Sequence, residues 1–324
     1  MRAMVVKRYG PPEVFEPREV PDPQAKPGEV LIRVKAVGVN FADLMQRMGI
    51  YPGTPKPPFV PGFEVSGVVE KAAEGGKASE GEPVRPGEAV AALSVFNAYA
   101  QWVSVPAGRV YRLPAGMPFE DGAAIPVNYI TAYHAMITMG NLRSGDRILI
   151  HGAAGGVGIA AVQLARAAGL RVVGTVGSER GRKLVLAEGA HEVLDHSAPH
   201  HFEEALAATG GRGYDLILEM LANVNLGRDL TILAPHGRVS VVGSRGNAEI
   251  TPRDMMGRDG AIFAMSLWNA TPQELISIHS ALVAGLENKT LRPVIGLEIP
   301  LAEAPRAHTT IMAAGAYGKI VLLP

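Results

Sequence analysis

The sequence predicts an α/β protein in which a β-rich first part precedes a doubly wound parallel sheet. Residues 1 to about 120 are rich in Pro and Gly and carry short apolar segments separated by turns. From about Ala123 onward, helix-like and strand-like periods alternate, which is typical of a parallel sheet with right-handed crossovers. A glycine-rich turn lies between the first strand and the first helix of this alternation, at residues 152–158.

The β-rich part contains four segments that are short, apolar and bounded by turn residues, as strands usually are. They cover residues 30–37, 65–69, 89–93 and 100–105. Pro-Gly turns at residues 26–29 and 85–88 separate some of them. Residues 74–86 are small or charged, so we expect them to form an exposed loop.

The second part is predicted to alternate strictly between strands and helices. The strands are expected at residues 147–151, 171–176, 192–195, 214–218 and 237–242, with helices at 156–168, 179–188, 201–208 and 225–233. Gly169, Gly189 and Gly237 follow or adjoin predicted helix ends, where glycine commonly caps the helix. A further helix is expected to begin at Thr271, with Pro272 in its first turn.

Composition limits the classes of protein to which the chain belongs. A length of 324 residues favours two domains, and 47% hydrophobic with 19% charged residues is ordinary for a globular enzyme. The formal net charge is zero, so charge gives no support for general binding to nucleic acid or membrane surfaces. No apolar run is long enough for a membrane span, and no signal-peptide segment is seen, so we expect a cytoplasmic protein.

The glycine-rich turn reads A-A-G-G-V-G at residues 153–158. Such a turn lets the backbone approach a pyrophosphate, whose negative charge is favoured at a helix N-terminus. Its candidate contacts are Ala154, Gly155, Gly156 and Val157. Because the first position is Ala153 rather than Gly, the motif alone also fits a tight strand-to-helix turn without a ligand.

The loop after the next strand reads G-S-E-R-G-R-K at residues 177–183. A chain that prefers NAD usually carries an acid here for the ribose hydroxyls. This chain has Gly177, Ser178, Arg180 and Lys183, which suit a ribose 2′-phosphate, whereas Glu179 is expected to open the following helix. The sequence therefore predicts NADP(H) as the cofactor.

Motifs along the whole chain resemble one family. They are V-N-F-A-D at 39–43, G-I-Y at 49–51, P-G-F-E-V-S-G at 61–67, T-A-Y at 131–133, G-A-H-E-V at 189–193, E-M-L-A-N-V-N-L at 219–226 and V-V-G-S-R-G at 241–246. On these residues the chain resembles the zinc-free, ζ-crystallin-like quinone oxidoreductases of the medium-chain dehydrogenase/reductase superfamily. The resemblance implies a GroES-like catalytic domain at 1–124, completed by 267–324, and a Rossmann-type NADP-binding domain at 125–266.

The same residues exclude a zinc site of the usual kind. Zinc-dependent relatives use a Cys in the segment that here contains Asn40, and a His in a Gly-His-Glu motif that here reads Gly62-Phe63-Glu64. Their structural zinc lobe needs four cysteines, and this chain has no cysteine, which also excludes disulfides and cysteine nucleophiles. We therefore expect no metal, and we expect Glu64 to be a buried ion-pair or hydrogen-bond partner.

The resemblance implies two catalytic residues, with Tyr51 over the nicotinamide and Asn40 on the substrate side. A phenol and an amide can donate hydrogen bonds to an oxygen that gains negative charge. The residue types alone also fit a packed loop aromatic and a turn-forming asparagine.

The remaining cofactor contacts come from the resemblance. Thr131 is expected near the nicotinamide ribose, His196 near the adenine and Asn225 near the ribose, although His196 also fits a plain surface histidine. The other expected contacts are Val242, Gly243, Ser244 and Arg245 near the pyrophosphate and nicotinamide, and Met265, Ser266 and Leu267 at the carboxamide.

The expected function is NADPH-dependent reduction of quinones in an interdomain cleft without metal, because a quinone is already electrophilic and the cofactor carries the chemistry. An NADPH-dependent reductase of enones or alkenals is the closest alternative. A ζ-crystallin-like structural or RNA-binding role is a third, which zero net charge and the lack of an aromatic and basic strand motif disfavour.

Residues 260–267 form an apolar, strand-like run. An exposed strand edge of this kind needs a partner. In the family that the chain resembles, the equivalent strands pair across a two-fold axis. A homodimer is therefore expected, or a homotetramer.

Overall fold

The computed structural model describes residues 1–79, 81–315 and 317–324, which form two compact units. The first unit comprises Met1–Val127, Leu275–Ala313 and Gly318–Pro324. The second unit comprises Asn128–Glu274 and the short segment Ala314–Tyr317. This division differs by several residues from the expected limits of 1–124 with 267–324 and 125–266, and it assigns Ala314–Tyr317 to the second unit.

The first unit is built on antiparallel strands. β1 (Arg2–Val6) pairs with β2 (Phe15–Glu19) in a two-stranded sheet. A seven-stranded sheet has the order β14-β15-β3-β4-β5-β7, and its seventh strand, β6, pairs antiparallel with β3 outside this order. The bounds are β3 Glu29–Val39, β4 Glu64–Ala72, β5 Ala89–Leu93, β6 Trp102–Pro106, β7 Val110–Arg112, β14 Ile295–Pro300 and β15 Lys319–Leu323. The four strands predicted in the first part of the chain are therefore confirmed.

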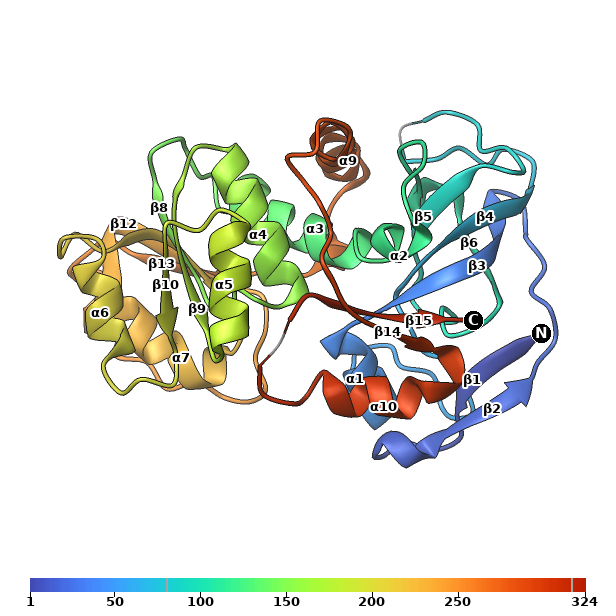
Figure 1. Ribbon diagram of the computed structural model, residues 1–324, viewed down its shortest axis with the longest axis horizontal. Helices are drawn as coiled ribbons and strands as arrows, with labels where there is room; N and C mark the ends of the chain where they lie inside the picture. The colour runs from blue at the N-terminus through green and yellow to red at the C-terminus, as the bar shows by residue number, and fades with distance from the viewer. Residues whose placement is uncertain (80, 316) are drawn as a thin grey trace. The chain divides into compact units, whose positions relative to one another are not determined.

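The C-terminal strand completes this sheet. β15 pairs antiparallel with β3, with Ile320 opposite Val39, and the two lie side by side in Figure 1 although they come from opposite ends of the chain. Short helices surround the sheet: α1 (Phe41–Met48), α2 (Phe119–Gly122), α10 (Ala304–Thr310), and the 3-10 turns η1 (Pro12–Val14), η2 (Ala107–Arg109) and η6 (Leu301–Glu303). α1 begins directly after β3, which places Asn40 at its N-cap.

The loop at residues 74–86 is not exposed throughout, so that prediction is wrong for four of its described residues. Gly76, Ala78, Ser79 and Val84 are buried, and Ala78 and Val84 belong to the hydrophobic core of the first unit. The Ser79 amide donates to the carbonyl oxygen of Val110, which ties the loop to the sheet. The small side chains of this segment allow it to pack closely.

The second unit contains a six-stranded, all-parallel sheet with the order β10-β9-β8-β11-β12-β13. The strands are β8 Arg147–Ile150, β9 Arg171–Val176, β10 Glu192–Asp195, β11 Tyr214–Glu219, β12 Leu233–Val241 and β13 Ala261–Ala264. The predicted alternation is confirmed. The strand order reverses between β8 and β11, the position at which doubly wound sheets bind ligands.

Helices cover both faces of this sheet. α4 (Gly156–Ala167) and α5 (Glu179–Ala187) lie on one side in Figure 1, and α6 (His201–Ala207) and α7 (Ala222–Asp229) lie on the other.

The remaining helical segments of the molecule are α3 (Pro126–Tyr133), the π-helical η3 (His134–Thr138), η4 (Leu230–Ile232), α8 (Pro252–Met256), η5 (Leu267–Asn269) and α9 (Pro272–Glu287). Within the described ranges, no helix combines the length and apolar character needed to cross a membrane.

The predicted helix caps are confirmed with one exception. Gly169 and Gly189 follow α4 and α5 with φ of +75° and +113°, and the Thr271 amide donates to Glu274 Oε2 at 2.7 Å at the start of α9. Gly237 is not a cap, because it lies inside β12, which begins earlier than expected. A Cβ at Gly237 would lie 2.5 Å from the carbonyl oxygen of Tyr214, so close backbone packing requires this glycine.

Candidate functional site

The glycine-rich turn directly follows β8 and leads into α4. Gly152 has a φ of +60° and accepts a hydrogen bond from the Gly155 amide at 3.0 Å, and Gly155 is the N-cap of α4. A Cβ at Gly156 would lie 2.4 Å from Nδ2 of Asn128, and one at Gly158 would lie 2.5 Å from the Gly152 carbonyl oxygen. The tight turn predicted from the sequence is therefore present, and backbone packing alone already requires Gly158.

The basic loop follows β9 and forms the start of α5. Ser178 is the N-cap of this helix, since its Oγ accepts a hydrogen bond from the Gly181 amide at 3.1 Å, and Glu179 opens the helix as predicted. Arg180 is exposed, and its guanidinium carbon lies 3.7 Å from the centre of the Tyr317 ring, within the second unit. Sequence reasoning missed Tyr317, because nothing near it in sequence connects it to this loop.

His196 lies against the same loop. It follows β10, and its Nε2 would be 2.6 Å from a Cβ at Gly177. A larger residue at position 177 would collide with the imidazole. The structure therefore brings together two predicted candidates, Gly177 and His196, that come from neighbouring strands.

The other cofactor candidates of the second unit follow the ends of the remaining strands. Asn225 is on α7, after β11, and its Nδ2 donates to Glu219 Oε1 at 3.3 Å. Val242, Gly243, Ser244 and Arg245 follow β12, and Met265, Ser266 and Leu267 follow β13. Because the strands are parallel, all of these residues are at the carboxyl edge of one sheet, where dinucleotides bind in doubly wound folds. Thr131 differs, since it is buried on α3.

A buried acidic cluster lies at this same edge and was not predicted. It consists of His151 after β8, Glu219 at the end of β11, and Asp229 at the end of α7. His151 Nε2 is 2.8 Å from Asp229 Oδ1 and 3.5 Å from Glu219 Oε2. Burial raises the pKa of each carboxyl group to about 7 and lowers the pKa of His151.

In the first unit, Asn40 belongs to a buried ionic network. Its Nδ2 donates to Glu64 Oε1 at 2.9 Å, and its Oδ1 accepts from Lys319 Nζ at 2.7 Å. Lys319 also forms a salt bridge with Glu64, whose other oxygen accepts from the Val127 amide at 2.7 Å. The prediction that Glu64 is a buried ion-pair partner is confirmed, and the network holds the Asn40 amide in one orientation.

A second chain of buried polar groups supports α1. Asp43 Oδ2 accepts a hydrogen bond from the backbone N–H of Asn40 at 2.8 Å and another from the Tyr99 hydroxyl at 2.9 Å. The Tyr99 oxygen is 3.0 Å from His308 Nε2, and His308 Nδ1 is 3.3 Å from the Arg47 guanidinium. Burial raises the pKa of Asp43 to about 7 and lowers that of His308 to about 3. These contacts fix the backbone that carries Asn40.

Tyr51 packs against the residue that replaces the zinc-binding histidine. Its ring is half-buried and meets the Phe63 ring edge-on, with 4.9 Å between the ring centres. Phe63 is buried, so it provides a fixed packing surface for the Tyr51 ring. The Tyr51 carbonyl oxygen accepts a hydrogen bond from the Thr54 hydroxyl at 2.6 Å, which further restrains the loop.

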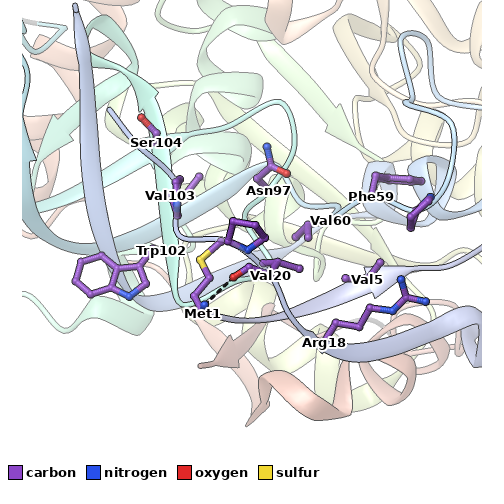
Figure 2. A pocket seen from close by; sticks show the side chains of 13 residues that line it. Met1, Val5, Arg18, Val20, Phe59, Val60, Asn97, Trp102, Val103 and Ser104 are labelled. Atoms are coloured by element: carbon purple, nitrogen blue, oxygen red, sulfur yellow. Dashed lines mark hydrogen bonds between the residues drawn. The ribbon is translucent and has the colours of Figure 1, made fainter. Parts of the chain in front are cut away.

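A separate cavity of about 410 Å³ lies in the first unit (Figure 2). Apolar side chains such as Val5, Phe59 and Trp102 form much of its wall. Of its polar side chains, Arg18 pairs with Glu16 at 2.9 Å. Neither Asn40 nor Tyr51 is among the lining residues, so this cavity is distinct from the candidate catalytic residues.

The buried network predicts that Lys319→Met destabilises the protein. The substitution leaves the Glu64 carboxylate buried without its cation, so the free energy of unfolding should fall by about 3–5 kcal/mol. Denaturant titration measures this change, and Lys7→Met, which removes an exposed lysine, is the control with an expected effect within about 0.5 kcal/mol. Adding Glu64→Gln to Lys319→Met should restore part of the loss, and equal stability of Lys319→Met and wild type would contradict the role of the ion pair.

Known proteins share both parts of this architecture. Residues 26–115 match the alcohol dehydrogenase GroES-like domain, and residues 156–281 match the zinc-binding dehydrogenase family. Human quinone oxidoreductase is 42% identical over 326 residues, which cover 100% of this chain and 98% of that protein.

Solved structures agree with these matches over the whole of both chains. The quinone oxidoreductase of Thermus thermophilus, solved also in complex with NADPH, is 36% identical with a TM-score of 0.86. Escherichia coli quinone oxidoreductase in complex with NADPH is 26% identical with a TM-score of 0.90. The absence of cysteine and the presence of Phe63 in the Gly-His-Glu motif remove the zinc ligands of the wider superfamily. The chain therefore belongs to the zinc-free quinone oxidoreductase family of the medium-chain dehydrogenase/reductase superfamily.

Proposed function

We propose that this protein uses NADPH to reduce quinones. The observation that carries the proposal is the sheet edge of the second unit, where the glycine-rich turn, the basic loop and Asn225 all follow carboxyl ends of parallel strands. Relatives with the same architecture, from Thermus thermophilus and Escherichia coli, are quinone oxidoreductases whose structures hold NADPH.

NADPH rather than NADH is proposed because of the residues at the start of α5. β9 ends at Val176 and is followed by Gly177 and Ser178, so no acidic side chain stands where a ribose 2′-hydroxyl would be bound. Arg180 is exposed, and its contact with the Tyr317 ring restrains the guanidinium group. Lys183 forms an exposed salt bridge of 4.0 Å with Glu179, and Arg180 and Arg182 leave the loop with a net positive charge.

Asn40 and Tyr51 of the first unit are proposed to act on the substrate side. The nicotinamide supplies the reducing equivalents, and a quinone needs no metal to polarise its carbonyl oxygen. A hydrogen bond from the Tyr51 phenol stabilises the negative charge that develops on that oxygen. Asn40 is held by Lys319 and Glu64, so its proposed role is to present a fixed polar surface beside the nicotinamide.

A homodimer is proposed from the edge of the parallel sheet. β13 pairs with β12 on one side only within the described sheet, and Ile262 and Phe263 are half-buried in the single chain. Pairing of β13 with a second copy would cover this edge. Sedimentation at micromolar concentration is expected to give at least a dimer mass, and a monomer mass would contradict the proposal.

The basic loop predicts that Arg180→Ala weakens NADPH binding selectively. A charge-assisted hydrogen bond to the 2′-phosphate contributes about 1.5–3 kcal/mol, so the Kd for NADPH should rise about tenfold or more while that for NADH stays nearly unchanged. Fluorescence titration with both cofactors measures the change. Arg182→Ala removes an equal charge from the same helix and should alter the ratio of the two Kd values much less. An equal loss for both cofactors would show that Arg180 does not recognise the phosphate.

The function is tested directly by steady-state turnover with a series of quinones and a series of enones and alkenals. We expect quinones to have the higher kcat/KM and the activity to survive exhaustive treatment with a chelator. Preference for enones would assign the alternative reductase activity. Inactivation by the chelator that zinc reverses would contradict the proposed metal independence.

In the same assay, Tyr51→Phe is expected to lower kcat about tenfold to a hundredfold, because one hydrogen bond to a developing charge in a dry site contributes about 1–3 kcal/mol. The Kd for NADPH should stay unchanged in this variant, because the aromatic ring is retained. Tyr51→Ala should additionally weaken NADPH binding. Turnover of Tyr51→Phe equal to that of wild type would show that Tyr51 only packs against Phe63.

A further inference from the structure

The acidic cluster of the second unit has no role in the function proposed above. His151 is 4% exposed, and Glu219 and Asp229 are fully buried. One imidazole nitrogen of His151, one carboxylate oxygen of Glu219 and one of Asp229 all lie within 4.8 Å of one another. The cluster sits where β8 and β11 adjoin, at the reversal of strand order, so it lies at the centre of the sheet edge that carries the cofactor candidates.

His151 contacts a carboxylate with one ring nitrogen and a hydroxyl group with the other. Its Nε2 is 2.8 Å from Asp229 Oδ1, and its Nδ1 is 3.2 Å from the Thr175 hydroxyl oxygen. Burial lowers the pKa of His151 and so favours the neutral imidazole, in which a proton on Nε2 is donated to Asp229 and Nδ1 accepts from Thr175. Oγ1 of Thr175 also accepts a hydrogen bond from the Gly152 amide at 3.3 Å. The cluster is thus connected through one hydroxyl group to the glycine-rich turn.

The two carboxyl groups need a proton between them. Glu219 Oε2 and Asp229 Oδ2 are buried and have no hydrogen-bond donor among the described residues. Two ionised carboxylates cannot lie together in a dry interior without a large cost in free energy, and one shared proton removes that cost. Burial raises the pKa of both groups to about 7, so the proton is held below neutral pH and released as the pH rises through about 7.

Glu219 also holds the residues that are proposed to bind the cofactor. Its Oε1 accepts hydrogen bonds from the Leu221 amide, at the N-cap of α7, and from Asn225 Nδ2. Its carbonyl oxygen accepts from the Val242 amide at 2.8 Å, and from the Gly243 amide at 3.3 Å. One residue therefore positions both the ribose candidate on α7 and the loop after β12.

No cation faces the cluster from the elements around it, as far as the structure describes them. His196, after β10, is a titratable neighbour of His151. From α6, the Phe202 ring packs near His151, with 5.8 Å between ring centres. Arg228, next to Asp229 on α7, directs its guanidinium to Glu203 at 3.0 Å and lies over the Phe202 ring. The charge of the cluster therefore changes chiefly by gain or loss of its own proton.

We propose that His151, Glu219 and Asp229 form a positioning triad that holds Asn225, the loop after β12 and the glycine-rich turn for NADPH, and that NADPH binding is coupled to retention of the proton shared by the two carboxyl groups. The inference rests on the proposed function, because it takes this sheet edge as the NADPH site. The direction in which NADPH affinity changes with pH follows from charge. The phosphates of NADPH disfavour a second negative charge behind the turn, so binding favours the protonated pair, and affinity falls as pH rises through about 7.

The experiment is a titration of the full-length protein with NADPH and NADH between about pH 6.5 and pH 8.5. For wild type, we expect the Kd to rise about threefold to tenfold across this range, since loss of one coupled proton changes a Kd by at most tenfold per pH unit. Glu219→Gln keeps an acceptor for Leu221 and mimics the protonated carboxyl group, so its Kd should vary less than about twofold. The 2′-phosphate of NADPH itself titrates near pH 6 and could also produce a pH dependence. NADH lacks this phosphate, so a pH dependence that NADH shares with NADPH comes from the protein.

Three further variants test positioning and specificity. Asp229→Asn should flatten the pH dependence as Glu219→Gln does, which keeps the test valid if one of the two fails to fold. Glu219→Ala removes the acceptor for Leu221 and Asn225 and should raise the Kd of both cofactors at every pH by about tenfold. Glu203→Gln alters an exposed carboxylate that bonds Arg228 of α7, and it should retain the wild-type pH dependence.

A pH dependence in Glu219→Gln and Asp229→Asn equal to that of wild type would overturn the triad while leaving the proposed function intact. A wild-type profile that a chelator abolishes would assign the cluster to a bound cation and would also overturn the shared proton. Failure of wild type to bind NADPH at any pH would overturn the proposed function and, with it, the role of the triad.

Discussion

The pairing of β8 with β11 is the constraint on which the second unit depends. Leu216, Ile217 and Leu218 lie opposite Ile148, Leu149 and Ile150, and all six are fully buried. The chain runs outward through β9 and β10 on one side of this pair and through β12 and β13 on the other. Every loop that follows a strand is therefore at one edge, with the glycine-rich turn at its centre. Hydrophobic burial of this central pair thus creates the edge at which doubly wound sheets bind ligands.

That arrangement also explains why the edge contains buried charges. The last residue of β11 is Glu219, and His151 follows β8 directly, so the pairing of the two strands brings their side chains together. Asp229 completes the cluster from α7, which returns over the same strand. Burial of three titratable groups reduces stability unless they satisfy one another. The hydrogen bonds that Glu219 accepts from Leu221 and Asn225 indicate that the cluster orders the loops around it.

The first unit also contains a buried charge that is balanced by other groups of the chain. Glu64 is fully buried, and its charge is balanced by Lys319 and by donors from Asn40 and Val127. Lys319 reaches this position because β15 pairs with β3 at the end of the chain. Phe63 packs edge-on against Tyr51 in the same unit. A cation carried by the chain thus balances the buried carboxylate beside Asn40.

The sequence by itself determined the features that depend on local patterns: the alternating strands and helices, the glycine-rich turn, the basic loop without an acid after β9, and the lack of zinc ligands. Each of these is visible within a few residues, because strand period, helix capping and turn chemistry are short-range properties. Only the tertiary structure decided which distant residues meet, such as Lys319 with Glu64, Tyr317 with Arg180, and His151 with Glu219 and Asp229. It also placed Gly237 inside β12 and buried Val84. These contacts join residues far apart in the chain, so sheet order and packing, rather than local propensity, produce them.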